Sequence, residues 1–386
     1  MVPAGTYLTG AIHLQSNVNL HVTKHATILF SQDTRKYLPV VFTRFEGVEL
    51  MNYSPFIYAY AQEHLALTGS GTIDGNASNE VWWPWKGKQE YGWKEGAPNG
   101  DADVAKLFQM AEDGVPVAQR VFGEGHYIRP NFIQLYKCKN VLIDSVTLKR
   151  SPMWEIHPVL CENVTISNVS VITHGPNNDG CNPESSKNVL LKNCYFDTGD
   201  DCIAIKSGRN ADGRRLNVAS ENIVIQGCRM KDGHGGVVIG SEASGSVRNV
   251  FAEDCMMDSP NLERALRIKT NSHRGGVIEN IFMRNVTVGE VSDAVIWVDF
   301  FYGEGDHGPH TPSVRNIFVS NVTSKQSNYG LFLKAYERAP IVNLRIENCK
   351  FDGVAKGNVL SHYRELQMKN VYINGELLQQ DSEARK

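Results

Sequence analysis

The chain has 386 residues, of which 41% are hydrophobic and 21% are charged, a composition that excludes a disordered, collagenous or coiled-coil protein. Its formal net charge of −3 provides no overall attraction for nucleic acid, and no run of about 18 apolar residues is present to form a membrane-spanning helix. The eight cysteines include no C-x-x-C pair, so we predict neither a disulfide framework nor a cysteine-based metal or redox site.

The first residues, Met1-Val2-Pro3-Ala4-Gly5, lack the positive and apolar regions of an export signal. We interpret Val2 as the end of a strand that begins before the first residue of this sequence. We therefore expect an N-terminal cap and an export signal to be missing from this chain. Further along, residues 17–22 and 65–75 alternate apolar and polar side chains, which predicts strands.

The strand pattern is interrupted at about residues 76–130. This stretch holds four of the six tryptophans, a turn rich in glycine, asparagine and aspartate, and a predicted short helix over residues 104–112. Loops longer than about fifteen residues are uncommon without a function. We predict an inserted, tryptophan-rich functional loop; the alternative is that the aromatic residues only anchor the loop to the rest of the chain.

From residue 140 onward, one short phrase recurs: Asn, an aliphatic residue, a variable residue and another apolar residue. It begins at Asn140, Asn163, Asn188, Asn222, Asn249, Asn280, Asn316, Asn343 and Asn370, at intervals of 23, 25, 34, 27, 31, 36, 27 and 27 residues. A fixed phrase with variable spacing is typical of a solenoid, and its period of two indicates strands. The sequence therefore predicts an all-β fold, a single-stranded parallel β-helix that forms one domain over residues 1–386.

Positions six residues after each Asn support this prediction. They are Val146, Val169, Cys194, Cys228, Cys255, Val286, Val322 and Cys349. Small apolar residues in one column are what close packing of stacked coils requires, so we expect these cysteines to lie in the core. The asparagines should stack at a corner of the coils, where their amides can pair from coil to coil.

Four polar groups follow the repeated Asn in consecutive coils: Asn177-Asn178-Asp179, Gly199-Asp200-Asp201, Gly233-His234-Gly235 and Arg267-Ile268-Lys269. Asp200 and His234 both lie 12 residues after their Asn, so they should be neighbours on adjacent coils, about 4.8 Å apart. Asp179 reaches the same surface with one small loop insertion. Asp200 and Asp201 can face one site only if the chain turns there, which Gly199 permits.

Three carboxylates at such close range repel one another, so we expect at least one to keep its proton near neutral pH. A protonated carboxyl beside ionised carboxylates is the arrangement that general acid and general base catalysis requires. Arg267 and Lys269 alternate so as to face the same side and would provide positive charge for an anionic substrate. The alternative for each residue alone is an exposed, solvated side chain.

These four motifs, in this order, resemble those of the polygalacturonases of glycoside hydrolase family 28. The resemblance covers nearly the whole chain and includes Arg129-Pro130 and the stretch from Ser151 to Trp154. Asn178 is a departure, since the family more often has Thr there. The resemblance implies a right-handed parallel β-helix that hydrolyses α-1,4-linked galacturonic acid with inversion, as part of pectin degradation in plant cell walls.

The resemblance also implies roles for individual residues. Asp200 would be the general acid, and Asp179 and Asp201 would be the bases that activate water, with acid and base about 6.5–9.5 Å apart. His234 would orient Asp200. The substrate-binding residues would be Asn177, which positions the sugar or Asp179, Arg267 and Lys269, which pair with its carboxylate, and Tyr302, which is a wall of the subsite or a core residue. No metal or other cofactor is expected.

Several alternatives remain open. A pectate lyase would share the fold but needs calcium and a strong base, and a non-catalytic β-helix could bind polysaccharide. A rhamnogalacturonan hydrolase would be expected to depart from the His and Arg-x-Lys motifs, both of which are intact here. Exo action is favoured over endo action because the loop at residues 76–130 could close one end of the cleft.

Cys181 and Cys202 directly follow motif residues, and we predict small core side chains rather than a disulfide. Sequons at Asn163, Asn168, Asn285 and Asn321 fall in predicted strands, which favours a bacterial origin. We expect a secreted or periplasmic protein whose partners are polygalacturonic acid or pectin oligosaccharides, with no nucleic-acid or membrane partner. The sequence leaves open the oligomeric state, the preferred pectin methylation and the pH optimum.

Overall fold

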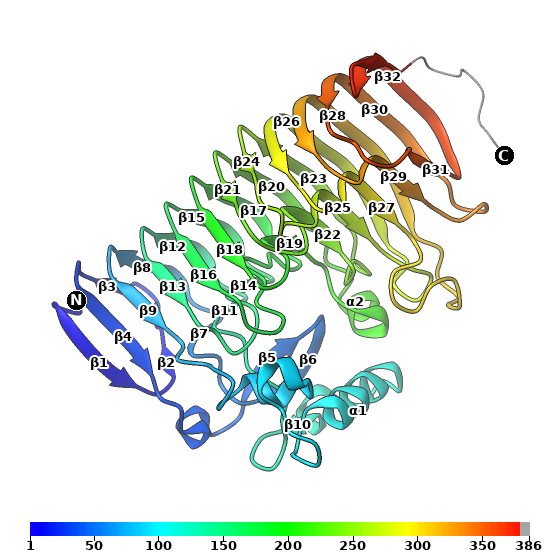
Figure 1. The fold of residues 1–386 in the computed structure, drawn as a ribbon. Helices are drawn as coiled ribbons and strands as arrows, with labels where there is room; N and C mark the ends of the chain where they lie inside the picture. The colour runs from blue at the N-terminus through cyan, green and yellow to red at the C-terminus, as the bar shows by residue number, and fades with distance from the viewer. Residues whose placement is uncertain (379–386) are drawn as a thin grey trace.

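The computed structural model describes residues 1–378, whose strands wind into a right-handed parallel β-helix with three faces (Figure 1). This confirms the predicted fold class. The last residues of the predicted domain, 379–386, lie outside the described part of the chain.

Three stacks of parallel strands form the faces. The first contains β3 (Asn19–Val22), β8 (Glu63–Gly69), β12 (Lys139–Asp144), β15 (Glu162–Ser167), β17 (Lys187–Lys192), β20 (Ser220–Gln226) and β23 (Val247–Glu253). The second contains β1 (Gly5–Thr9), β4 (Ala26–Phe30), β9 (Thr72–Asp74), β13 (Thr147–Lys149), β16 (Ser170–Thr173), β18 (Tyr195–Thr198), β21 (Arg229–Met230) and β24 (Met256–Met257).

The third face contains β2 (Ile12–His13), β7 (Ile57–Tyr60), β11 (Ile133–Tyr136), β14 (Ile156–Val159), β19 (Ile203–Ile205), β22 (Val237–Gly240), β25 (Arg264–Lys269), β27 (Ala294–Asp299), β29 (Tyr329–Lys334) and β31 (Val359–Ser361). In the last coils the first two faces are covered by the continuous strands β26 (Val277–Glu290), β28 (Ser313–Gln326), β30 (Ile341–Phe351) and β32 (Tyr363–Ile373). The short β33 (Glu376–Leu377) pairs antiparallel with β32.

The interior is one apolar core that runs the length of the solenoid. The column predicted six residues after each repeated Asn is buried throughout, with every side chain at most 2% exposed. All eight cysteines are free and buried. Cys181 and Cys202 are therefore core residues and not a disulfide, as predicted.

The repeated asparagines form a ladder of side-chain hydrogen bonds from Asn140 to Asn343, in which each amide donates to the Asn of the preceding coil at 2.8–3.1 Å. Their φ angles lie between 55° and 59°. Asn is favoured at such a corner because it tolerates the left-handed conformation and its side chain can bond to the next coil.

The prediction for Asn370 was wrong. Asn370 donates to Asn348 at 3.0 Å and thus belongs to a second corner ladder, while Glu365 takes the position opposite Asn343. Each coil has two left-handed corner positions five residues apart, as Asn343 and Asn348 illustrate. Because both corners favour Asn, the phrase alone cannot distinguish them.

Insertions project from one corner, between the second and third faces. The predicted insertion lies between β9 and β11 and holds η2 (Trp83–Lys86), η3 (Gln89–Tyr91), α1 (Asp101–Glu112), η4 (Val117–Gln119) and β10 (Val121–Phe122). An earlier insertion, which the sequence did not reveal, holds η1 (Thr34–Tyr37) and the hairpin β5 (Val41–Phe45) and β6 (Val48–Asn52). β10 pairs with β6, so the two insertions form one unit.

A further short helix, α2 (Asn210–Leu216), follows β19 and lies beside α1 (Figure 1). The Arg209 guanidinium, in the segment between β19 and α2, lies 3.9 Å from the ring centre of Phe108 in α1, which ties this segment to the insertion. No helix in the described part of the chain is both long and apolar enough to cross a membrane.

Candidate active site

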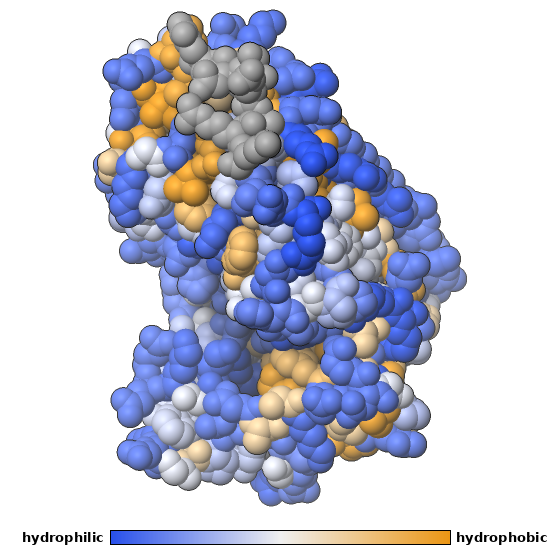
Figure 2. Space-filling view, turned by 90° about the vertical axis from the view of Figure 1, so that its right-hand side faces the viewer, coloured by the Kyte–Doolittle hydropathy of each residue, from blue (hydrophilic) through white to orange (hydrophobic). Residues whose placement is uncertain are grey.

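A pocket of about 430 Å³ opens at the corner from which the insertions project. Figure 2 shows the surface hollowed between the lower part of the molecule and the coils above it. Six of the eight predicted site residues line the pocket: Asn177, Asp179, Asp200, Asp201, Lys269 and Tyr302. The other two contact these, since His234 is hydrogen-bonded to Asp200 and Arg267 forms an ion pair with Asp201.

The three aspartates come together because each lies in the turn that joins the second face to the third. Asp179 follows β16, and Asp200 and Asp201 follow β18. Gly199 is required there because a Cβ atom would lie 2.7 Å from the Gly175 carbonyl oxygen of the preceding coil. Gly233 does the same for the next coil, where a Cβ atom would lie 2.6 Å from the Asp200 carbonyl oxygen.

Asp179 is almost fully buried, with 3% of its side chain exposed. Its carboxylate accepts a hydrogen bond from Asn182 at 2.6 Å and lies 3.7 Å from the Lys206 amino group. Burial raises the pKa of Asp179 well above its ordinary value, and the negative charge of Asp200 adds to that effect. The surroundings of Asp179 therefore favour its protonated form.

Asp200 is more accessible, with 19% of its side chain exposed, and it is paired with His234 at 2.9 Å. Burial alone would raise the pKa of Asp200, but the hydrogen bond and charge of His234 outweigh burial and hold that pKa below its ordinary value. The same hydrogen bond raises the pKa of His234 to about 9. The free protein thus holds an imidazolium–carboxylate pair at this position.

Asp201 is fixed by two cations. The Lys269 amino group lies 2.7 Å from one carboxylate oxygen, and Arg267 lies 3.2 Å from the other. The Tyr302 ring covers both cations, with its centre 5.1 Å from the Lys269 nitrogen and 5.6 Å from the Arg267 guanidinium carbon. Tyr302 is therefore part of the pocket wall and not of the core.

Asn177 and Asn178 hold the turn before Asp179. The Asn178 side chain is buried, accepts a hydrogen bond from the Gly175 N–H at 2.8 Å and donates to the Met153 carbonyl at 3.1 Å. Asn177 accepts a hydrogen bond from Arg129 at 2.8 Å. The side-chain contact to Asp179 comes from Asn182, not from Asn177.

Several charged residues of the pocket were missed in the sequence. The largest omission is Lys206, whose amino group lies 3.0 Å from Glu242 and 4.4 Å from the ring centre of Trp154. Lys206 directly follows β19 in the pair Ile205-Lys206, and the same residue pair, Ile268-Lys269, ends β25, so this shared pair could have identified Lys206. Glu46, Lys86, Arg209, Arg274 and Glu304 also line the pocket.

The described residues contain a group of side chains with the spacing of metal ligands, His174, Asp197 and Asp232, but it lies outside the pocket. Asp197 is already paired with Lys231 at 3.0 Å. Within the pocket, Asp179 is paired with Lys206, and Asp201 is paired with Arg267 and Lys269. These side chains stand where a metal ion bound by the two carboxylates would lie. These residues do not form a metal site of the usual oxygen-rich type.

The sequence matches the family model described as glycosyl hydrolases family 28 over residues 122–363. A probable polygalacturonase from Vitis vinifera is 28% identical over 92% of this chain and 67% of its own length. An exo-poly-alpha-D-galacturonosidase from Dickeya chrysanthemi is 27% identical over 84% of this chain and 56% of its own length, so the chain spans between half and two thirds of these relatives.

Among solved structures, a hyperthermoactive exopolygalacturonase from Thermotoga maritima superimposes with a TM-score of 0.94 and 50% sequence identity. The match covers 97% of this chain and 84% of that protein.

Proposed function

Because the chain belongs to family 28 of the glycosyl hydrolases, we propose that it cleaves α-1,4-galacturonosyl linkages of polygalacturonic acid and acts from a chain end. The observation that carries this proposal is the pocket that holds three carboxylates, an imidazole and several cations in contact with one another. The likeness to the exopolygalacturonase of Thermotoga maritima supports the substrate and the mode of attack. As its substrate is a polymer of plant cell walls, we propose that the protein acts outside the cytoplasm.

In this proposal the linkage is hydrolysed with inversion by direct attack of water. Asp200, the most accessible of the three aspartates, gives a proton to the glycosidic oxygen. Asp179 and Asp201 hold the attacking water, and the ionised one of the two takes its proton. The positions of Asp179 and Asp201, fixed by Asn182 and Lys269, suit residues that must orient a water molecule.

For this assignment to work, the proton must be on Asp200 when the linkage is cleaved, whereas in the free protein the pKa of Asp179 is raised and that of Asp200 is lowered. An entering galacturonate brings negative charge and excludes water. Both effects raise the pKa of a nearby carboxyl group. We propose that substrate binding transfers a proton to Asp200, and that protonated His234 is its immediate source.

Substrate recognition is assigned to Asn177, Arg267, Lys269 and Tyr302. Arg267 and Lys269 share Asp201, and their positive charges together exceed the single charge of that carboxylate. This local excess suits a substrate carboxylate. Tyr302 provides an aromatic surface beside it.

Action from a chain end rests on the two insertions. Glu46, at the tip of the hairpin β5–β6, and Lys86, at the end of η2, stand at one side of the pocket. A second pocket of about 280 Å³ shares Glu46 and Lys86, and its lining includes the aromatic residues Phe45, Trp85, Phe108 and Tyr127 together with Asp101 and Arg129. We propose that the insertions close the cleft after one sugar unit.

The proposal of metal-independent hydrolysis separates the protein from a pectate lyase. A lyase requires calcium bound by carboxylates, and here Lys206, Lys269 and Arg267 neutralise those carboxylates. A non-catalytic polysaccharide-binding protein would have no need of buried aspartates with shifted pKa values. The intact His234 and Arg267-x-Lys269 motifs favour homogalacturonan over rhamnogalacturonan.

Chromatography of products from polygalacturonic acid at low conversion, in the presence of a chelator, tests this function. We expect saturated monogalacturonate from the parent protein and a loss of roughly 10²–10⁴-fold in rate for Asp200→Asn. Asp144→Asn, which removes a carboxylate from the first face, should leave the rate unchanged.

The other products are equally informative. Digalacturonate would show that the second pocket accepts another sugar unit, and mixed oligomers would show an open cleft. Unsaturated products that disappear in chelator would indicate a lyase. Full turnover by Asp200→Asn would remove Asp200 from the mechanism.

A further inference from the structure

The cations that line the pocket differ in whether a protein carboxylate neutralises them. Lys206 is paired with Glu242, Arg209 with Glu242 and Glu304, Lys269 with Asp201, and Arg274 with Glu304, at distances of 2.7–3.6 Å. Lys86 is the exception: among the described residues, no carboxylate oxygen lies within 4.0 Å of its amino group. It also forms no side-chain hydrogen bond with any of them.

Lys86 is held in place by the aromatic residues that precede it. Trp82 is fully buried against Tyr37 of the earlier insertion and against Phe56, which directly precedes β7. Trp83 donates its indole N–H to the Ser151 carbonyl at 2.8 Å. Because η2 ends at Lys86 directly after these anchors, the Lys86 stem is supported and not a free surface chain.

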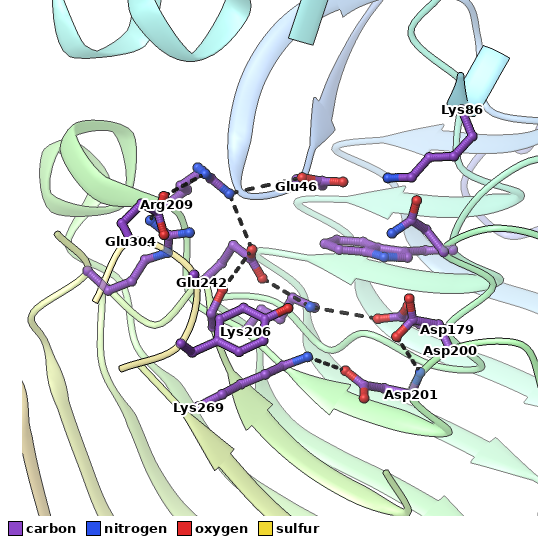
Figure 3. Close-up of a pocket in the computed structure, with 16 residues that line it drawn as sticks. Glu46, Lys86, Asp179, Asp200, Asp201, Lys206, Arg209, Glu242, Lys269 and Glu304 are labelled. Carbon is purple, nitrogen blue, oxygen red and sulfur yellow. Dashed lines mark hydrogen bonds and ion pairs between the residues drawn. The ribbon is translucent and has the colours of Figure 1, made fainter. Parts of the chain in front are cut away.

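The Lys86 side chain reaches the pocket from the side of the insertion, whereas Lys269 comes from β25 (Figure 3). In this view Asp179 and Asp200 lie below Lys86, and Asp201 lies beside the Lys269 amino group. A galacturonan carries one carboxylate on each sugar, so a substrate bound across the aspartates presents carboxylates in both directions. The Arg267–Lys269 pair lies on one side of the linkage, and Lys86 lies on the other.

The surroundings of Lys86 are suited to a positive charge whose ion-pair partner is supplied by a bound anionic ligand. Burial lowers its pKa, and the charges of Glu46 and Asp200 oppose that effect while Arg129 and Lys88 reinforce it. A partly buried ammonium group without an ion pair is costly to hold. An anionic ligand removes this cost, so binding there is favourable.

We propose that Lys86 binds the carboxylate of the terminal galacturonate unit and thereby makes the enzyme select a charged sugar at the chain end. This inference rests on the proposed function and extends it by assigning a specificity residue to the insertion. It also gives the tryptophan-rich segment a purpose beyond anchoring, since Trp82 and Trp83 position the lysine that contacts the substrate.

The test compares two substrates and several variants. The substrates are trigalacturonate and a trigalacturonate with a methyl ester on the terminal unit that is released. The variants are Lys86→Met, Lys86→Gln and Lys86→Arg. The control is Lys88→Met, because Lys88 belongs to the same segment but is 59% exposed, pairs with Glu90 and does not line the pocket.

We expect the parent to prefer the free acid by roughly 10- to 100-fold in kcat/KM, as suits one charge-assisted hydrogen bond. Lys86→Met and Lys86→Gln should lose that preference, Lys86→Arg should keep part of it, and Lys88→Met should match the parent. The loss should fall on the free acid and leave the rate with the ester nearly unchanged.

An equal loss for both substrates, or an unchanged preference, would overturn the proposal while the hydrolase assignment stands. Absence of hydrolysis by the parent would overturn the hydrolase assignment and the Lys86 proposal with it. The melting temperature of each variant separates a binding defect from misfolding. If Lys86→Met does not fold, the preference measured with Lys86→Gln decides.

Discussion

The first face of the solenoid and the corner that carries the pocket are built from the same coils. They differ in whether neighbouring coils carry the same residue at equivalent positions. On the first face, neighbouring coils place like beside like: Asn222 bonds to Asn188, and Phe282 stacks between Phe251 and Phe318 at 4.8 and 4.9 Å. At the corner, the equivalent turns carry a different polar residue in each coil.

The difference shows what each region contributes. A repeated contact adds the same stabilisation at every coil and is tolerant of loop length, as expected for a solenoid. Around the pocket, charges of both signs are buried, and each depends on particular partners in neighbouring turns, as Lys206 depends on Glu242 and Asp179. Stability is therefore spread over the first face and concentrated in single ion pairs at the corner.

Lys206→Met tests this contrast most severely. The substitution removes the cation that lies between the carboxylates of Asp179 and Glu242. Burial lowers the pKa of Lys206, but these two carboxylates raise that pKa above its ordinary value. Loss of one partner of a buried ion pair costs about 3–5 kcal/mol. We expect a loss of that size in the free energy of unfolding, measured with denaturant, together with loss of hydrolysis because Asp179 is no longer held.

The matched control is Lys187→Met on the first face. Lys187 is 51% exposed and pairs with Glu221 at 3.5 Å, and an exposed pair contributes at most about 1 kcal/mol. Equal destabilisation by the two substitutions would contradict the idea that the corner concentrates its stability in single ion pairs.

Glu155 allows the stability of the pocket region and of the first face to be compared as a function of pH. Its side chain is fully buried beneath the pocket, and its N–H donates to the Asp179 carbonyl at 2.9 Å. Burial raises the pKa of Glu155 to about 8. In the unfolded chain the pKa of Glu155 is near 4.5, so the folded protein holds this proton more tightly. The stability that protonated Glu155 provides is therefore complete below pH 4.5 and is lost as the pH rises from 4.5 to 8.

Glu155→Gln should abolish that fall. Between pH 5 and pH 8 the parent should lose roughly 2–4 kcal/mol relative to the variant, since each pKa unit is worth about 1.4 kcal/mol. Denaturant unfolding at the two pH values measures the difference, and Glu279→Gln on the first face controls for removal of a carboxylate. Parallel stabilities of the parent and Glu155→Gln across this range would show that Glu155 is not protonated in the folded state.

The repeating part of the molecule could be read from the sequence because its contacts depend on position within the coil. The cysteine and valine column, the asparagine ladder and the Asp200–His234 contact all follow from counting residues. Counting failed at Asn370, where two corner positions accept the same residue. Gly199 was expected for its turn, and the structure adds that close approach to Gly175 requires it.

The remainder of the site depends on contacts that no local pattern records. The hairpin β5–β6 brings Glu46 to the pocket only because β10, some 70 residues later, pairs with β6. Lys86 reaches the pocket through the packing of Trp82 on Tyr37 and Phe56, which lie far from it in the sequence. The expectation that one aspartate keeps its proton stays a prediction, and the burial that raises the pKa of Asp179 is a feature that the sequence does not show.

Asn222 provides the smallest effect and tests the first face directly. It donates to Asn188 at 3.1 Å, accepts from Asn249 at 3.0 Å and has a φ of 58°. Asn222→Gly removes both side-chain hydrogen bonds but keeps a residue that adopts this φ without strain, whereas Asn222→Ala adds the cost of the left-handed conformation. The ladder is exposed to solvent, so we expect a loss of about 1 kcal/mol for Gly and about 2 kcal/mol for Ala.

Neither Asn222 variant should change the hydrolysis rate, because the ladder lies on the first face and away from the pocket. Denaturant unfolding measures the two losses, and their difference isolates the backbone contribution. A loss of several kcal/mol for Asn222→Gly would mean that one rung supports many coils at once. The first face would then be as dependent on single residues as the corner, and the distinction between the two regions would fail.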